Sequence, residues 1–325
     1  TNRADCLSLA GMAREVGVLN RLPVTFPAFN KVEPQHDDTF PVAIAAEDGC
    51  PRYLGRVVKN VDVSVNTPIW MVERLRRSGI RSIDPVVDIT NYVMIELGQP
   101  MHGFDLDQLK GGINVRWADN KEKLTLLDGS EVELTDQTLL ITDESGPLAL
   151  AGIMGGENTG VSAATKNIFF EAAYFNPLSI AGRARSYGLH TDSSHRFERG
   201  VDYTLAERAI ERATELLLEI AGGQPGPVTD VKSAEHFPGE KSVSLKLSRI
   251  EKVLGLEISE EEVDQILADA TLDQNQETWR LDCKVLQNVP DYLIRQCFLQ
   301  IWQRMSWSRK RMGFDHWQRL LMLTH

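Results

Sequence analysis

Cationic side chains are concentrated in one short segment of the chain, between Gly182 and Gly200. The segment contains Arg183, Arg185, His190, His195, Arg196 and Arg199. Arginine guanidinium groups form paired hydrogen bonds to phosphate oxygens, so these side chains are candidates for contacts with the backbone of a nucleic acid. The alternative interpretation is a solvated charged turn between two helices.

One carboxylate is unusual because it lies in an apolar segment. Glu171 occurs in the string Ile168-Phe-Phe-Glu-Ala-Ala-Tyr-Phe175. A carboxylate is costly to bury unless it is paired or binds a ligand, which makes Glu171 a candidate binding residue. Because side chains alternate along a strand, the alternative is that Glu171 points to water.

Three glycines in the string AGIMGGE could let the backbone approach a ligand closely: Gly152, Gly155 and Gly156. The spacing does not fit GxGxxG, and the chain contains no GxxxxGK[ST] motif, so a nucleotide-binding loop is not predicted. The alternative is a tight apolar turn between two strands.

One arginine and one histidine outside the cationic segment are further candidates for a functional site. Arg81 lies in GIRSID, and His102 follows a proline turn in QPMHGFD. A histidine in this setting is more often structural than catalytic, although imidazole is suited to general base catalysis. The sequence lacks HExxH, and His190 and His195 are not spaced for one helical face, so no metal site is predicted.

The elements around these residues predict an α+β fold, in which a mixed-sheet domain is flanked by helices and followed by a small helical module. Helices are predicted over residues 1–20, 69–78 and 86–97, after Asn176-Pro177, and from a Thr204/Glu207 capping box to Gly222. Strands are predicted over residues 113–117, 124–127, 132–134, 138–142 and 168–172. Asp128-Gly129 predicts a two-residue hairpin, and Ser259 with Glu262 predicts a capping box in the small module.

Length and composition limit the classes of protein. The 325 residues suffice for roughly two domains, and the net charge of −11 means that any nucleic-acid contact must come from a local basic surface. The four cysteines form no CxxC pair, which excludes a zinc ribbon and favours a reducing, cytoplasmic compartment. No apolar run is long enough to span a membrane. Because the chain begins at Thr1 rather than Met, we expect a fragment of a longer protein.

Six strings resemble, in order and spacing, the bacterial phenylalanyl-tRNA synthetase β chain: TNRADCLSLAGMAREV, CPRYLGRVV, GIRSIDPVVDITNYVMIELGQPMHGFD, LLDGSEVEL, LAGIMGGE and GLHTDSSHRFERGVD. The resemblance implies a helix and linker at 1–39, an editing domain at 40–232 and a helix-turn-helix-like module at 240–285. A basic, Trp-rich tail follows at 286–325. In the family, the editing domain hydrolyses tyrosine that is wrongly esterified to phenylalanine tRNA.

The resemblance also implies roles for residues near the scissile ester. Arg81 and His102 match pocket residues beside the ester, and Thr191 matches a hydroxyl close to the substrate. An aminoacyl ester is already activated, so its hydrolysis mainly needs a positioned water and a stabilised oxyanion. We therefore favour positioning over a covalent nucleophile, with the terminal hydroxyl of the tRNA assisting.

A second group of matched residues surrounds the amino-acid side chain. Glu171 matches the carboxylate that binds the tyrosine hydroxyl, and such a bond is worth about 1.5–3 kcal/mol. Gly155, with Gly152 near it, matches a glycine whose small size keeps the pocket open. Ser193 stands where the family often has alanine, which places a hydroxyl at the pocket wall.

The family implies partners and cofactors beyond this chain. These are phenylalanine tRNA mischarged with tyrosine and the α subunit, in an assembly of two α and two β chains. ATP and Mg²⁺ belong to the complete enzyme, and no cofactor is predicted in this fragment. The tail departs from the family's acidic cluster, which only Asp282 echoes, and suggests a shifted reading frame. Two alternatives remain: a non-catalytic module that binds tRNA or bridges subunits, and a free-standing domain acting on another aminoacyl-tRNA.

Overall fold

The structure is a computed structural model that describes residues 3–238 and, further along, residues 250, 252, 255, 257–263 and 265. The chain divides into two compact units, which we describe separately. One combines Thr1–Gly11 with Phe26–Gly239, and the other combines Met12–Thr25 with Glu240–His325. The larger unit thus extends beyond the 40–232 range expected for the editing domain. Among the described residues, no helix has the length and apolar character needed to cross a membrane.

Helices and strands of the described residues follow one another in this order: η1 (Ala4–Cys6), α1 (Leu9–Asn20), β1 (Val42–Ile44), β2 (Arg52–Lys59), α2 (Ile69–Arg77), α3 (Pro85–Leu97), β3 (His102–Asp105), η2 (Leu106–Gln108), β4 (Ile113–Trp117), β5 (Lys123–Thr125), β6 (Glu131–Glu133), β7 (Leu139–Asp143), β8 (Gly146–Leu150), β9 (Met154–Gly155), η3 (Glu157–Thr159), β10 (Ile168–Tyr174), α4 (Pro177–Ile180), α5 (Arg183–Ser186), α6 (Asp192–Phe197), α7 (Leu205–Ala221), β11 (Gln224–Lys232) and η4 (Ala234–His236).

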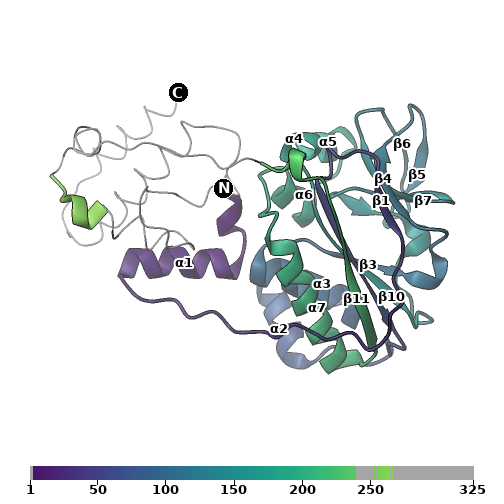
Figure 1. The fold of residues 1–325 in the computed structure, drawn as a ribbon, viewed down its shortest axis with the longest axis horizontal. Coiled ribbons are helices and arrows are strands. Elements are labelled where there is room, and N and C mark those ends of the chain that lie inside the picture. Colours follow the sequence, from purple (N-terminus) through teal and green to yellow (C-terminus); the bar gives the residue numbers. More distant parts are fainter. Residues whose placement is uncertain are drawn as a thin grey trace. The chain divides into compact units, whose positions relative to one another are not determined.

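The larger unit contains a five-stranded sheet in the order β1-β4-β7-β8-β9 and a four-stranded sheet in the order β11-β2-β10-β3. Strands β5 and β6 form a separate hairpin. The β1–β4 pair is parallel, whereas β10 pairs antiparallel with both β2 and β3. Helices α2, α3 and α7 lie together beside the four-stranded sheet (Figure 1). This arrangement confirms the predicted α+β class with a mixed sheet.

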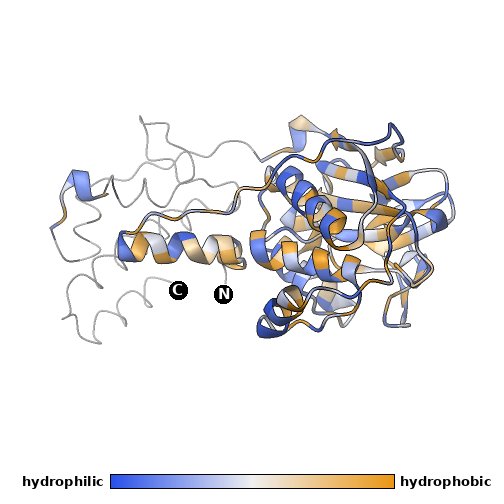
Figure 2. Ribbon diagram, turned by 90° about the horizontal axis from the view of Figure 1, so that it is seen from below, coloured by the Kyte–Doolittle hydropathy of each residue, from blue (hydrophilic) through white to orange (hydrophobic). Residues whose placement is uncertain are grey.

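Strand β10 is buried along its whole length and divides its side chains between two cores. Phe169 and Ala173 face the core shared with the five-stranded sheet. Phe170 and Ala172 face the core under the helices. The apolar residues that fill both cores recur along the strands in the hydropathy view of Figure 2. Since residues of odd number share the first face, Glu171 points between the two sheets rather than to water.

A buried ion pair joins β2, α7 and β11 to the extended segment that precedes β1. Arg56 on β2 lies 3.0 Å from Glu211 on α7, and both side chains are almost fully buried. Glu211 also accepts the Val32 N–H at 2.8 Å, while Arg56 donates to the carbonyls of Val32 and Gly226. The segment predicted as an irregular linker is therefore held in place by two charged side chains.

The structure corrects several local predictions. The loop between β5 and β6 has three residues rather than two, because Leu126 N–H donates to the Ser130 carbonyl at 2.9 Å. Gly129 occupies the left-handed position at φ +80°, as three-residue hairpins require. The helix predicted over 1–20 begins only at Leu9, since the Ser8 hydroxyl caps it by accepting the Gly11 N–H.

The predicted capping box at Thr204 is wrong. The Thr204 backbone is already helical, and its hydroxyl donates to Asp202 at 2.7 Å instead of accepting an N–H from the first turn of α7. The other helix ends agree with the sequence: Asp84 caps α3, Asn176 caps α4, and α7 ends before Gly222. Strand ends shift by one or two residues, except in β4, which spans the predicted 113–117.

In the smaller unit, the Ser259 hydroxyl accepts the Glu262 N–H at 3.2 Å, which is one half of the predicted capping box. The Glu262 carboxylate accepts a hydrogen bond from Arg21 at 2.9 Å. Most of the helix-turn-helix-like module predicted at 240–285 falls outside the described residues. Asp282 and the tail at 286–325 lie wholly outside them, so the predicted change of reading frame stays a prediction.

Replacing Glu211 by glutamine should destabilise the protein by about 3–5 kcal/mol, because the variant leaves the Arg56 charge buried without a counter-charge. Urea denaturation measures the change in the free energy of unfolding. Glu131→Gln is the matched control, since the Lys123–Glu131 pair is exposed and should contribute little. Equal effects of the two substitutions would contradict the importance assigned to the buried pair.

Candidate functional site

Glu171 lies on the face of β10 that is turned toward the five-stranded sheet. Its partners in the register are Gly55 on β2 and His102 on β3. Only 6% of the residue is exposed, and within the described part of the chain no hydrogen bond or ion pair reaches its carboxyl group. Burial raises the pKa of Glu171 to about 8, so the group is mostly a neutral acid at pH 7.

This charge state differs from the carboxylate expected from the sequence. A neutral acid can donate a hydrogen bond as well as accept one. Gly55, directly opposite Glu171, contributes no side chain, and the Phe169 ring occupies the space that a Cβ atom at Gly55 would need. The acid is therefore bordered by apolar surface on one side.

His102 is the cross-strand neighbour of Glu171 and is also held without a polar partner. Its ring packs edge-on against Phe104, with centroids 4.4 Å apart, and its Nε2 atom is buried with no hydrogen-bond partner. Burial lowers the pKa of His102 to about 4, so the imidazole is neutral at pH 7. A group with this pKa is a weak general base near neutrality, which favours a positioning role over proton abstraction.

The glycine string forms the turn between β8 and β9 and brings Gly155 against His102. A Cβ atom at Gly155 would lie 2.8 Å from Cε1 of His102 and 3.1 Å from Leu127. Gly152 adopts φ +67°, and a Cβ atom there would lie 2.9 Å from Phe175. The interpretation as a strand-to-strand turn is thus correct, and the same turn contributes Gly155 to the surroundings of His102.

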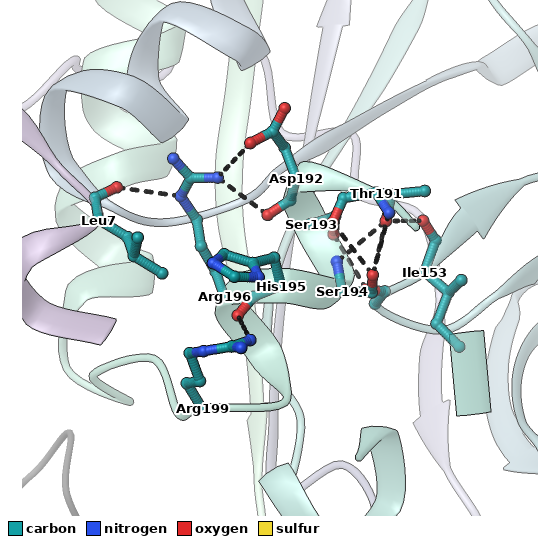
Figure 3. Close-up of polar contacts among 10 residues, drawn as sticks. Leu7, Ile153, Thr191, Asp192, Ser193, Ser194, His195, Arg196 and Arg199 are labelled. Atoms are coloured by element: carbon teal, nitrogen blue, oxygen red, sulfur yellow. Dashed lines mark hydrogen bonds and ion pairs between the residues drawn. The ribbon is translucent and has the colours of Figure 1, made fainter. Parts of the chain in front are cut away.

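Two hydroxyls at the start of α6 hold this turn (Figure 3). Thr191 donates to the Ile153 carbonyl at 2.9 Å, and Ser193 donates to the Gly152 carbonyl at 3.1 Å. Thr191 also caps α6 by accepting the Ser194 N–H at 3.0 Å. The two residues therefore fix the position of the glycine turn through its backbone. The Ser193 hydroxyl that the sequence places at the pocket wall thus takes part in this attachment.

Arg81 lies in the loop between α2 and α3, and its side chain is exposed. Buried Asp88 holds this loop by accepting the Ser82 hydroxyl at 2.5 Å and the Ile83 N–H at 2.9 Å. Next along the chain, Val86 packs beneath Gly103, the neighbour of His102. The loop that carries Arg81 is thus held by Asp88, and the helix α3 that follows it packs against the edge strand β3. The hydrogen bonds among the described residues include none from Arg81 to His102 or Glu171.

The cationic segment forms two short helices, α5 and α6, and its members differ in accessibility. Arg196 is buried and donates to the Leu7 carbonyl at 3.1 Å and to Asp192 at 3.0 Å (Figure 3). Arg199 donates to the His195 carbonyl at 2.9 Å and pairs with Glu198. These two guanidinium groups already stabilise the fold, and buried Arg196 also differs from the alternative of a solvated charged turn between two helices.

The remaining members of the cationic segment are more accessible. Arg185 and His190 are exposed, whereas Arg183 is half-buried. The rings of His190 and His195 lie 5.8 Å apart. Contact of Arg183, Arg185 and His190 with nucleic acid stays a prediction.

Two polar residues near Glu171 were missed by sequence reasoning. Within the part of the chain that the structure describes, the buried Tyr53 hydroxyl and Gln99 Oε1 atom have no hydrogen-bond partner, and neither has Nε2 of His102. Tyr53 belongs to the string CPRYLGRVV and Gln99 to GQP, and both strings were used only for their overall resemblance. Tyr53 lies on β2, which is buried along almost its whole length, but an apolar string in the sequence cannot show which hydrogen bonds its hydroxyl makes.

The described residues offer only a weak candidate for a metal site. Glu47, Glu235 and His236 could bring three ligand atoms together, but all three residues are exposed. Exposed acidic clusters are common without an ion. The absence of a Mg²⁺ site in this chain stays a prediction, because Asp282 lies outside the described part.

Comparison with known proteins now defines the class. The chain belongs to the B3/4 domain family, whose sequence profile matches residues 49–222. It is 61% identical over 267 residues to the phenylalanine–tRNA ligase β subunit of Hahella chejuensis, covering 82% of this chain and 34% of that protein. The β subunit of Pseudomonas savastanoi is 56% identical over 284 residues, covering 86% and 36%. These matches confirm the resemblance drawn from the six strings.

The chain spans about a third of the length of these curated relatives. An N-terminal fragment of the phenylalanyl-tRNA synthetase β-subunit from Pyrococcus horikoshii is 16% identical, with a TM-score of 0.38. That alignment covers 93% of this chain and 84% of the other. The TM-score is too low to support a comparison of individual residues.

The raised pKa of Glu171 predicts a specific pH dependence of stability. The folded state binds a proton more tightly than the unfolded state between pH 4.5 and about 8, so the wild type loses stability as the pH rises through this window. The loss is at most about 1.4 kcal/mol per pH unit. Glu171→Gln removes this dependence, so its stability relative to the wild type should increase from pH 5 to pH 8.

Urea denaturation of both proteins at pH 5 and pH 8 measures this change. Glu133→Gln, an exposed glutamate on β6, is the control and should show no such trend. An unchanged difference between Glu171→Gln and the wild type at the two pH values would refute the buried neutral acid.

Replacing Gly155 by alanine should displace the His102 ring, because the new methyl group would approach Cε1 to 2.8 Å. Overpacking of this kind costs roughly 1–3 kcal/mol. The ring resonances of His102 in an NMR spectrum report the displacement. Gly160→Ala is the control, since its Cβ atom would meet Leu127 at an ordinary 3.4 Å. Identical His102 resonances in the wild type and Gly155→Ala would contradict the contact.

Proposed function

We propose that this chain is the editing region of a phenylalanine–tRNA ligase β subunit and hydrolyses tyrosine esterified to phenylalanine tRNA. One observation carries the proposal: the Glu171 carboxyl is buried between two sheets without a protein partner. Keeping a polar group in this state costs free energy, and a ligand that supplies the missing hydrogen bond offsets the cost. The similar proteins, which are phenylalanine–tRNA ligase β subunits, supply the class of enzyme.

The chemistry of the substrates explains why an acid belongs at this position. Tyrosine differs from phenylalanine by one hydroxyl, and a pocket that offers this hydroxyl a hydrogen bond prefers tyrosine. Because Glu171 is mostly neutral at pH 7, its bond to the hydroxyl is worth about 0.5–1.5 kcal/mol, less than the charged bond expected from the sequence. This corresponds to roughly a twofold to tenfold preference.

Hydrolysis of the aminoacyl ester needs little chemical participation of protein side chains. The ester is activated, so a held water and a stabilised oxyanion supply most of the effect. Neutral His102 serves to position the ester or the water through its unpartnered Nε2 atom. Thr191 acts by fixing the glycine turn, since its hydroxyl is already bonded to the Ile153 carbonyl. Exposed Arg81 is available to contact the terminal nucleotide, whose hydroxyl assists the attack of water.

The same proposal implies the compartment, partners and cofactors of the complete protein. The complete protein works in the cytoplasm with an α subunit, two copies of each chain forming the assembly, and phenylalanylation of tRNA uses ATP and Mg²⁺ on parts beyond this chain. A non-catalytic module that binds tRNA or bridges subunits is the competing function. It is favoured by the exposed Arg185 and His190, which could contact tRNA without a hydrolytic step.

Deacylation of Tyr-tRNA and Phe-tRNA, both on phenylalanine tRNA, distinguishes the two functions. The purified chain should deacylate Tyr-tRNA faster. Glu171→Ala should lower this rate by roughly twofold to tenfold and leave Phe-tRNA deacylation unchanged. Glu133→Ala, on the exposed strand β6, should leave both rates unchanged. A folded chain that binds the tRNA but hydrolyses neither ester would instead establish the non-catalytic module.

A further inference from the structure

Several polar groups that have no hydrogen-bond partner among the described residues are placed around one short stretch of β10. They are the Tyr53 hydroxyl, Gln99 Oε1 and His102 Nε2, which are completely buried, and the Glu171 carboxyl. A native protein rarely leaves buried polar atoms unpaired, because each one costs free energy. A group of them in one place indicates a ligand that provides the missing bonds.

The strand register places Tyr53 close to Glu171. Tyr53 pairs with Ala173, and Glu171 pairs with Gly55, so the two side chains are diagonal neighbours on the same face of the sheet. Diagonal neighbours lie about 7–8 Å apart at their Cα atoms, within reach of an aromatic and a long side chain. Burial raises the pKa of Tyr53 well above its usual value, and the nearby Glu171 adds to that rise. Tyr53 is therefore a neutral phenol at physiological pH.

Gln99 contacts the same part of β10, at Ala173. Its Nε2 atom donates to the Ala173 carbonyl at 2.9 Å, just beyond the place where β3 stops pairing with β10. Tyr53 on β2 and Gln99 in the loop before β3 therefore both contact β10 at Ala173. His102, opposite Glu171, borders the group on the side of Gly155.

We propose that Tyr53 is a specificity-determining residue of the proposed editing site, and that its hydroxyl binds the phenolic hydroxyl of the substrate together with Glu171. The inference rests on the proposed function. A phenolic hydroxyl has one hydrogen to donate and lone pairs to accept. It can donate to one of the two protein groups and accept from the other, which satisfies all three. A phenylalanine ring in the same place leaves both protein groups unpaired.

The test compares Tyr53→Phe with the wild type in two measurements. The first is the ratio of the deacylation rates for Tyr-tRNA and Phe-tRNA. The second is the ratio of the dissociation constants for tyrosinol and phenylalaninol, which needs no tRNA. Removing one neutral hydrogen bond should lower the preference for the tyrosyl compound by roughly twofold to tenfold in both ratios. The affinity for phenylalaninol should stay the same or increase.

The variant keeps the volume of the ring and loses no protein hydrogen bond, so its free energy of unfolding should equal or exceed that of the wild type. Tyr203→Phe is the matched control, because Tyr203 is a half-buried tyrosine stacked on Phe237. This control should change neither ratio.

The outcomes separate this inference from the function on which it rests. If the wild type prefers the tyrosyl compounds and Glu171→Ala removes the preference while Tyr53→Phe keeps it, the role of Tyr53 is refuted and the proposed function stands. If Tyr53→Phe is less stable and leaves both tyrosyl-to-phenylalanyl ratios unchanged, the Tyr53 hydroxyl binds an internal water instead. The proposed role is then refuted as well. If the wild type shows no preference in either measurement, both are refuted.

Discussion

The double burial of β10 is the constraint on which the rest of the larger unit depends. A strand covered on both faces must fill two cores at once, and its seven residues do so with a single carboxyl group among them. The helices α2, α3 and α7 close one face and the five-stranded sheet closes the other. That enclosure makes Glu171 a neutral acid and His102 a neutral base. The chemical character of the site thus arises from the layering of the fold rather than from charged neighbours.

The enclosure also depends on segments that carry no regular structure. The Arg56–Glu211 pair fixes the extended chain before β1. Buried Asp88 fixes the loop that carries Arg81, and Thr191 with Ser193 fixes the glycine turn. Each attachment uses a buried or capping side chain to bind backbone atoms of an irregular segment. Rigid attachment of loops to a layered scaffold is what a binding site between two sheets requires.

Local chemistry explains which features the sequence could predict. The ends of α3 and α4 follow from capping residues, and the class of fold follows from the order of the elements. The capping box predicted at Thr204 is wrong because the nearby Asp202 carboxylate binds the Thr204 hydroxyl. Arg196 resembled a phosphate ligand, but its partner is a carbonyl 189 residues away. The polar partners of Tyr53 are likewise decided by tertiary packing, which no local pattern contains.

The contact between Gly155 and the His102 ring has an evolutionary consequence. Two positions that share one small volume cannot vary independently: a larger residue at 155 is acceptable only when the side chain at 102 becomes smaller or turns away. Natural selection therefore acts on the pair. A relative without the imidazole would be released from the demand for glycine, so covariation of the two positions across an alignment would record where this contact is maintained.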